Sequence, residues 1–504
     1  MANEGVIVTG GKSRVFSIEG QAGPANVPYY HSWAAAGSVE QPVGDITRVE
    51  APSLTEYGAF DVVGEVLGAE ENATITITLQ DRMSASEVLA YARRRCPFDI
   101  QIHQGSCQDP RDFDSGWDKI RVFERARATS YSTSELGSLE SGDVEKITEE
   151  LEISALEYYE ILPMTYAEKA TSEVTNEIIA ITVCDKPSCG DCNNASNGCS
   201  KVFAISAPAG TSPGLGAEVV FTDDGFATAG DTPITTLAAG QDPDDAVCVG
   251  ANLVVVSNAA TGFGIHWAPS ADILDGTETW TKVVTGLVAA HYPTCITTAS
   301  PRDTWMGGDG GYIYFATDPI NGVVVQDAGV ASTENINDIY AYSTKLVVAV
   351  GNANTILYTT NGSSWAAIAG PAALAGVNLN CVTVRKETEW WIGAANGTLY
   401  YTLDSGAHWY LQAFPGSGAG EVLAIEFASD TVGFLSHMTA APLGVILRTI
   451  SGGNTWYVAP EGTSTVPAAD KYNSIAVCID EVNTMYAGGL ADASLDGIII
   501  KGVA

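Results

Sequence analysis

A short turn that ends in tryptophan recurs through the second half of the chain. Residues 402–409 follow the pattern [ST]-x-D-x-G-x-x-W, and residues 449–456 repeat it with Ser451 in place of the aspartate. Residues 359–365 are one residue shorter and carry Asn361 at the same place. Successive tryptophans of these turns are 44 and 47 residues apart. A period of about 40–50 residues with several short strands per unit predicts a β-propeller.

These turns predict structure and not chemistry. In such a turn an Asp or Asn side chain accepts hydrogen bonds from backbone N–H groups, and glycine supplies a positive φ. The tryptophan packs between neighbouring sheets. Weaker copies occur at residues 222–225 and 275–280. We assign structural turn roles to Asp224, Asn361, Trp365, Asp404, Gly406, Trp409, Ser451, Gly453 and Trp456.

A cysteine recurs in phase with the turns. Cys248, Cys295, Cys381 and Cys478 each stand near the start of a repeat, so we expect equivalent buried free thiols on the first strand of each unit. Dividing the region gives a seven-bladed propeller over residues 201–504. The last unit looks one strand short, and residues 201–206 are expected to supply that strand. The units are expected to start near residues 201, 246, 290, 334, 376, 420 and 470.

The region resembles the Asp-box (BNR) propellers of sialidases and of photosystem assembly factors, on the strength of these turns. Sialidase chemistry would require an arginine triad, a Tyr nucleophile paired with Glu, and an Asp acid/base. The candidate arginines are Arg302 in a Pro-Arg-Asp turn, Arg385 in a segment that looks solvated, and Arg448 just before a turn. The arginine motif expected in the first blade is absent. We therefore predict no enzyme activity, no catalytic residues and no cofactor-binding residues.

Acidic residues are spread along the whole chain. The net charge is −36; the first 200 residues carry 15 Lys+Arg and 32 Asp+Glu, and the remainder carry 9 and 28. This balance excludes a nucleic-acid grip and docking on anionic lipid, since both need basic surface. Neither a signal peptide nor an apolar run long enough to span a membrane is expected, which predicts assembly in the cytoplasm.

The first 175 residues predict a mostly β domain, a sandwich or barrel with one helix. Residues 73–79 alternate between β-branched or apolar residues and threonine, as a half-buried strand does. Residues 84–95 then predict a helix, with a capping box at its start and Arg93–Arg95 at its end. Further strands are expected at 98–102, 120–122 and 151–155, and long polar loops at 25–58 and 104–118.

This layout resembles a phage major tail tube protein. The resemblance implies a virion structural protein assembled in the host cytoplasm, with hexameric rings of the same chain that stack and contact other virion proteins. DNA would pass an acidic lumen as cargo that does not stick, because like charges repel. The outer propeller would then bind host-surface glycans weakly through many copies. The alternative is a propeller-based receptor-binding, glycan-binding or adhesion protein; the third hypothesis is a sialidase-like glycosidase.

A cysteine cluster occupies residues 176–200, which we interpret as a joint between the domains. Cys184, Cys189, Cys192 and Cys199 fall within 16 residues rich in Gly, Asn, Asp and Pro. Two disulfides, a four-cysteine zinc site and free thiols all remain open at this point. The segment has one C-x-x-C and lacks the second of a strong zinc signature.

Overall fold

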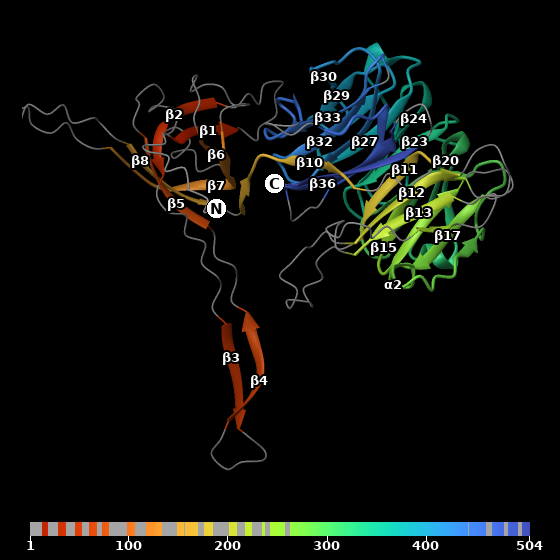
Figure 1. The fold of residues 1–504 in the computed structure, drawn as a ribbon, viewed down its shortest axis with the longest axis horizontal. Helices are drawn as coiled ribbons and strands as arrows, with labels where there is room; N and C mark the ends of the chain where they lie inside the picture. The colour runs from red at the N-terminus through yellow and green to blue at the C-terminus, as the bar shows by residue number, and fades with distance from the viewer. Residues whose placement is uncertain are drawn as a thin grey trace, which may run out of the picture. The chain divides into compact units, whose positions relative to one another are not determined.

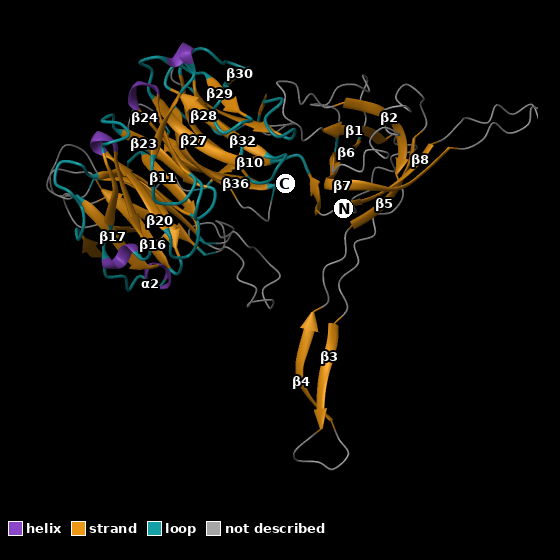
Figure 2. Ribbon diagram, turned by 180° about the vertical axis from the view of Figure 1, so that it is seen from behind, coloured by secondary structure: helices purple, strands orange, loops and turns teal. Residues whose placement is uncertain are grey.

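The chain forms two compact units, mainly residues 1–162 and Pro163–Ala504. The computed structural model shows both as mostly β (Figures 1 and 2). No helix among the described residues is long and apolar enough to cross a membrane. The structure describes residues 13–18, 29–36, 46–52, 60–67, 73–79, 98–105, 117–133, 149–155, 157–169, 176–184, 201–208, 217–223, 234–236, 242–257, 263–441, 443–459, 466–477, 482–491 and 496–503.

The second unit is built from four-stranded antiparallel sheets, seven of them in the described residues. The first three sheets are β11 (Ile178–Val183), β12 (Val202–Pro208), β13 (Ala217–Thr222), β14 (Ile234–Thr236); β15 (Pro243–Val249), β16 (Asn252–Ser257), β17 (Gly264–Pro269), β18 (Thr281–Val283); β19 (Pro293–Thr298), β20 (Thr304–Gly308), β21 (Tyr312–Ala316), β22 (Val324–Ala328). The next two are β23 (Ile336–Ala341), β24 (Val347–Gly351), β25 (Thr355–Thr359), β26 (Ala366–Ala369); β27 (Leu379–Lys386), β28 (Glu389–Ala394), β29 (Leu399–Thr402), β30 (Tyr410–Gln412). The last two are β31 (Glu421–Phe427), β32 (Gly433–Met438), β33 (Gly444–Thr449), β34 (Tyr457–Val458); β35 (Lys471–Val477), β36 (Thr484–Leu490), β37 (Gly497–Val503), β10 (Thr165–Glu168).

The first strands of these sheets follow one another in a cycle. Each contacts the first strand of the next sheet, from β11 through β15, β19, β23, β27, β31 and β35, and β35 contacts β11 again. Apolar clusters fill six of the seven spaces between neighbouring sheets of the described residues, and one of them joins Ile178 and Val202 to Tyr486 and Ile499. Burying sheet faces against one another in this way is the packing of a β-propeller.

A strand from outside the expected region completes the last sheet. The unit was expected to borrow residues 201–206, but β12 pairs with β11 and β13 in the first sheet. The missing strand is β10, which pairs with β37 from Thr165↔Val503 to Glu168↔Ile500. The expectation was wrong because an unpaired strand edge can pair with any extended segment of suitable length. The edge of β37 is covered by β10.

The propeller unit also begins earlier than residue 201. β11 lies within the segment expected to be a linker, and its residues Ile178, Ala180 and Ile181 are buried. The expected starts of the other six sheets each fall within three residues of the observed first strand. Short helices interrupt the sheets: α2 (Ser270–Leu274), η3 (Asp309–Gly311), η4 (Pro319–Asn321), η5 (Asn352–Asn354) and η6 (Ala372–Leu374).

The first unit is a small closed barrel. Its strands run in the order β6-β1-β2-β5-β8-β7-β9, and β6 also pairs with β7, which closes the sheet. Strands β8 and β9 lie along successive halves of β7. The bounds are β1 (Ser13–Ile18), β2 (Tyr29–Ala36), β5 (Ala73–Leu79), β6 (Phe98–Gln104), β7 (Lys119–Thr133), β8 (Glu149–Ala155) and β9 (Glu157–Ile161).

The expected strands at 73–79, 98–102, 120–122 and 151–155 are confirmed. Strand β6 differs in one respect, because its polar residues Asp99, Gln101 and His103 are buried along with its apolar ones. The loop expected at 25–58 instead contains β2 and β3 (Ile46–Pro52), which pairs with β4 (Phe60–Leu67) in a separate hairpin. The expected helix at 84–95 lies outside the described residues.

Candidate binding cavity at the centre of the propeller

Each first strand of the propeller carries the same irregularity near its start. The pairing with the second strand shifts by one residue, as at Pro243/Asp245 and Leu379/Cys381, so one residue bulges out. In four strands the bulged side chain donates a hydrogen bond to a backbone carbonyl of the next first strand. These bonds are Thr294 Oγ1 to Ile336 O (2.6 Å), Asn337 Nδ2 to Leu379 O (2.8 Å), Asn380 Nδ2 to Val422 O (3.0 Å) and Asn473 Nδ2 to Ile178 O (2.8 Å).

The residue after the bulge joins neighbouring strands a second time. Asp245 accepts from the Ile296 N–H at 2.9 Å and Asp338 from the Val382 N–H at 2.7 Å. Ser474 accepts in the same way from Ile181 N–H at 3.2 Å. The bulged residues and the residues that follow them therefore join neighbouring first strands through side-chain hydrogen bonds.

Two cysteines occupy the same position in other sheets. Cys295 and Cys381 are buried and free, and burial raises the pKa of both thiols. Glycines stand opposite: a Cβ at Gly307 or Gly393 would lie 2.8 or 2.5 Å from the facing sulfur. The residue of β15 at this position is Asp245, so the expected equivalence of Cys248 with the other two is wrong. Cys478 lies outside the described residues.

The seven first strands enclose a central cavity of about 410 Å³. Its lining mixes the apolar residue Leu423 with polar ones from the bulged positions of other strands. Four acidic residues line it: Asp244 and Asp245 on β15, Asp338 on β23 and Glu426 on β31. The lining contains no Lys, Arg or His within the part of the chain that the structure describes.

Burial changes the acidity of three of these carboxyls, those of Asp245, Asp338 and Glu426. Burial raises the pKa of Asp245 to about 7 and that of Asp338 to about 6, although backbone N–H donors oppose the rise. Burial raises the pKa of Glu426 to about 8, and the charges of Asp338 and Asp245 raise it further. The cavity therefore holds negative charge and protons that exchange near neutral pH.

Sequence reasoning missed this cluster. A signal was present, because Asn-Asp, Asn-Cys and Asn-Ser recur at 337–338, 380–381 and 473–474, where the strands bulge. Glu426 had no such signal. Glu426 lines the cavity only because β31 is one of the strands arranged around it.

The tryptophan turns link each sheet to the one before it. At residues 402–409, Asp404 accepts from the His408 N–H at 2.8 Å and Thr402 from the Gly406 N–H at 2.8 Å. The Trp409 indole donates to Ala369 O of β26 at 3.1 Å. Gly406 has φ +86°, and a Cβ there would meet the Ile368 side chain at 2.6 Å.

The other two described turns make comparable links. Asn361 accepts from Ser364 N–H at 2.8 Å, and Trp365 donates to Gln326 of β22 at 2.9 Å. Trp456 is buried and lies edge-on to Trp391 of β28, with ring centroids 6.2 Å apart. Ser451 accepts from the Thr455 N–H and Gly453 has φ +90°, while Asp224 lies outside the described residues.

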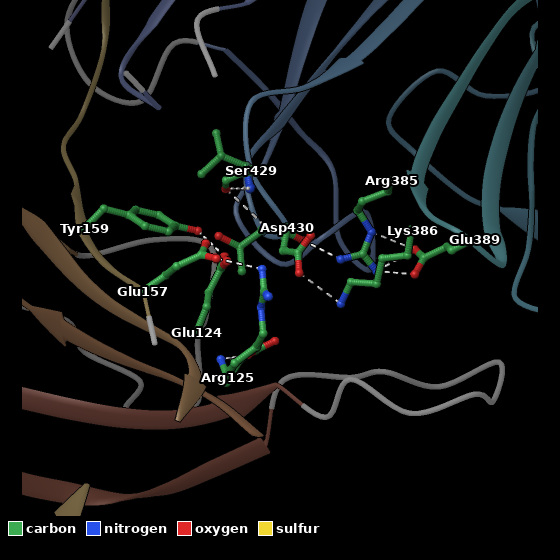
Figure 3. A network of polar contacts seen from close by, with 12 residues as sticks. Glu124, Arg125, Glu157, Tyr159, Arg385, Lys386, Glu389, Ser429 and Asp430 are labelled. Carbon is green, nitrogen blue, oxygen red and sulfur yellow. Dashed lines mark hydrogen bonds and ion pairs between the residues drawn. The ribbon is translucent and has the colours of Figure 1, made fainter. Parts of the chain in front are cut away.

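A buried ion pair lies near the contact between Trp456 and Trp391. Arg385 is 8% exposed and forms a bidentate pair with Glu389, which is 7% exposed, at 2.5 Å (Figure 3). Arg385 also donates to Asp430 O, and Lys386 pairs with the Asp430 carboxylate at 3.3 Å. The expectation that Arg385 is solvated is wrong, because Glu389 and the Phe427 ring enclose its guanidinium.

The three propeller arginines do not gather at one site. Arg302 is exposed in its turn, Arg385 is bound to Glu389, and Arg448 is buried over the Phe434 ring. None of the three lines the central cavity. A sialidase needs such side chains together on a substrate carboxylate, and the described residues do not bring them together.

Cys184 leaves the predicted cluster. It forms a disulfide with Cys248, 64 residues away, and so joins the end of β11 to β15. Cys189, Cys192 and Cys199 lie outside the described residues. Within the described ranges no three His, Cys, Asp or Glu side chains are arranged to hold a metal ion. A four-cysteine zinc site that uses Cys184 is incompatible with this disulfide, because a disulfide sulfur is not a thiolate ligand.

Comparison with known proteins does not place the chain in a family. No family model and no curated protein matches the chain. Among solved structures, YCF48 from Cyanidioschyzon merolae is 14% identical, with a TM-score of 0.48, covering 67% of this chain and 98% of that one. YCF48 bound to D1 peptide is also 14% identical, with a TM-score of 0.48, covering 68% of this chain and 98% of that one. U3-55K is 9% identical, with a TM-score of 0.49, covering 68% of this chain and 98% of that one. The WD40 propeller of Doa1 is 12% identical, with a TM-score of 0.46, covering 67% of this chain and 96% of that one. These four structures are propellers, and none of them is a phage tail tube protein.

Proposed function

We propose that this chain is a non-enzymatic binding protein whose propeller holds its ligand at the central cavity. The observation that carries the proposal is the cavity of about 410 Å³ lined by all seven first strands. That volume falls within the range of about 300–1,000 Å³ that is usual for ligand sites, and its mixed lining is also usual. Side-chain bonds between neighbouring strands keep such a site rigid, which lowers the entropic cost of binding.

We further propose that the seven sheets are the blades of one closed ring. The contact of β35 with β11 and the pairing of β10 with β37 support closure. In a closed ring the sheets pack face to face, so a ligand can reach only the loops and the cavity. A protein segment inserted at the cavity mouth is the ligand that we place first.

The test is selection of random peptides on the full-length protein, with a blocked cavity as control. Ala424 lines the cavity, so Ala424→Phe fills part of it; Ala373→Phe adds the same bulk at an exposed position outside it. We expect selected peptides to bind the wild type and Ala373→Phe equally, and Ala424→Phe at least tenfold more weakly. Equal binding to all three proteins would move the site away from the cavity.

Two further assays separate the other hypotheses. Hydrolysis of a fluorogenic sialoside by the purified protein, lost in Arg448→Ala, would favour the glycosidase and overturn the non-enzymatic proposal. Sedimentation velocity across protein and salt concentration would detect rings or tubes. Assembly of that kind would return the self-assembling structural role to first place.

A further inference from the structure

Three of the four acidic residues that line the cavity lie on alternate first strands. Asp245, Asp338 and Glu426 lie on β15, β23 and β31, which are the second, fourth and sixth of the seven first strands. The described lining offers no cationic side chain to balance them. The cavity therefore has a negative potential that its low-dielectric walls strengthen.

Two of these carboxyls, those of Asp245 and Asp338, accept hydrogen bonds from backbone N–H groups. Asp245 accepts from the N–H groups of Ala246 and Ile296, at 2.8 and 2.9 Å. Asp338 accepts from Ile339 and Val382, at 2.7 Å each. In both residues each oxygen has a backbone donor, so the carboxylate holds two strands together without a ligand.

Glu426 differs from the other two. No donor among the described residues contacts its carboxyl, and the residue is half-buried in the cavity lining. The other titratable residues of the lining are Asp244, Asp245, Asp338, Tyr340, Cys295 and Cys381, and none of them is cationic. A half-buried carboxyl without a protein donor beside other acidic groups is unfavourable, and a cation supplied from outside would offset that cost.

We propose that the cavity binds the basic side chain, Lys or Arg, of a partner protein segment, with Glu426 as the acceptor of its charged group. The inference rests on the proposed binding function and adds the chemistry of the ligand. The apolar side chain of Leu423, at the bulged position of β31, suits the methylene stem of such a residue. Carboxyls on separate strands suit an extended organic cation, whereas a metal ion needs its ligands within one coordination sphere.

The experiment compares peptides selected from a random library on the wild type with their neutral analogues. We expect the selected peptides to share one Lys or Arg, and replacement of that residue by norleucine to raise the Kd at least tenfold. Glu426→Gln should raise the Kd of the basic peptides about tenfold, because a charge-assisted hydrogen bond becomes a neutral one. Glu387→Gln, the same change at an exposed position outside the cavity, should leave the Kd unchanged.

Each outcome decides the inference. Peptides that bind at the cavity but carry no basic residue would overturn it and leave the proposed function intact. Failure to select any peptide would count against both. If Glu426→Gln does not fold, the norleucine exchange on wild-type protein decides alone. Calorimetric binding of Ca²⁺ without selection of basic peptides would replace the organic cation with a metal.

Discussion

Removing the Glu426 carboxyl should change how the stability of the propeller depends on pH. The pKa of Glu426 is about 8 in the folded protein against an ordinary value of 4.5. Below about pH 4.5 both states hold the proton. As pH rises, the unfolded chain releases the proton first while the folded chain keeps it until about pH 8. The free energy of unfolding therefore falls between these values, and Glu426→Gln should abolish that part of the fall.

The size of the effect follows from the same values. A rise from 4.5 to about 8, at about 1.4 kcal/mol per pH unit, sets an upper limit of about 5 kcal/mol. Water that enters the cavity as the carboxyl ionises reduces this, so we expect about 2 kcal/mol. The remaining slope belongs partly to Asp245 and Asp338, whose raised pKa values of about 7 and about 6 act in the same direction.

Urea unfolding at pH 5, 6.5 and 8.5 and constant ionic strength measures the effect. Tryptophan fluorescence suits the assay, because eight of the ten tryptophans lie in the propeller unit and its transition is followed separately from that of the barrel. Relative to wild type, Glu426→Gln should gain about 2 kcal/mol between pH 5 and pH 8.5, and Glu387→Gln should gain none. Curves of wild type and Glu426→Gln that run parallel across this range would refute the reasoning.

Three further predictions test the ring and its cross-links. A fragment of residues 163–504 should fold, whereas 201–504, which lacks β10 and β11, should show no cooperative unfolding by circular dichroism; equal cooperativity would contradict the closure described here. Arg385→Ala should lower the free energy of unfolding by about 3–5 kcal/mol in urea, since it leaves the Glu389 charge buried without its partner; a loss under 1 kcal/mol would mean that water reaches this pair. Cys184→Ser should cost about 2–4 kcal/mol, as removal of a disulfide usually does, and dithiothreitol should destabilise the wild type but not the variant; equal sensitivity to dithiothreitol would argue against the cross-link.

Local patterns in the sequence were sufficient for much of the fold. Alternation predicted β5 and the strands after it, because side chains on a strand point to opposite faces in turn. The tryptophan period located six of the seven first strands within three residues, since each sheet repeats the same turn geometry. The assignment of Cys248 failed for a related reason: it has the right neighbours in sequence but lies three residues beyond Asp245, which occupies the position that follows the bulge.

The repeat, and hence the propeller, was determined by the sequence alone, because it is written in residues a few positions apart. The tertiary structure alone decided which strand completes the last sheet: Thr165 bonds to Val503 across 338 residues, and a strand edge does not specify by local pattern which segment will cover it. It also decided the Cys184–Cys248 cross-link and the gathering of Asp245, Asp338 and Glu426. Those carboxyls lie about 90 residues apart along the chain, and only the circular arrangement of the strands brings them to one cavity.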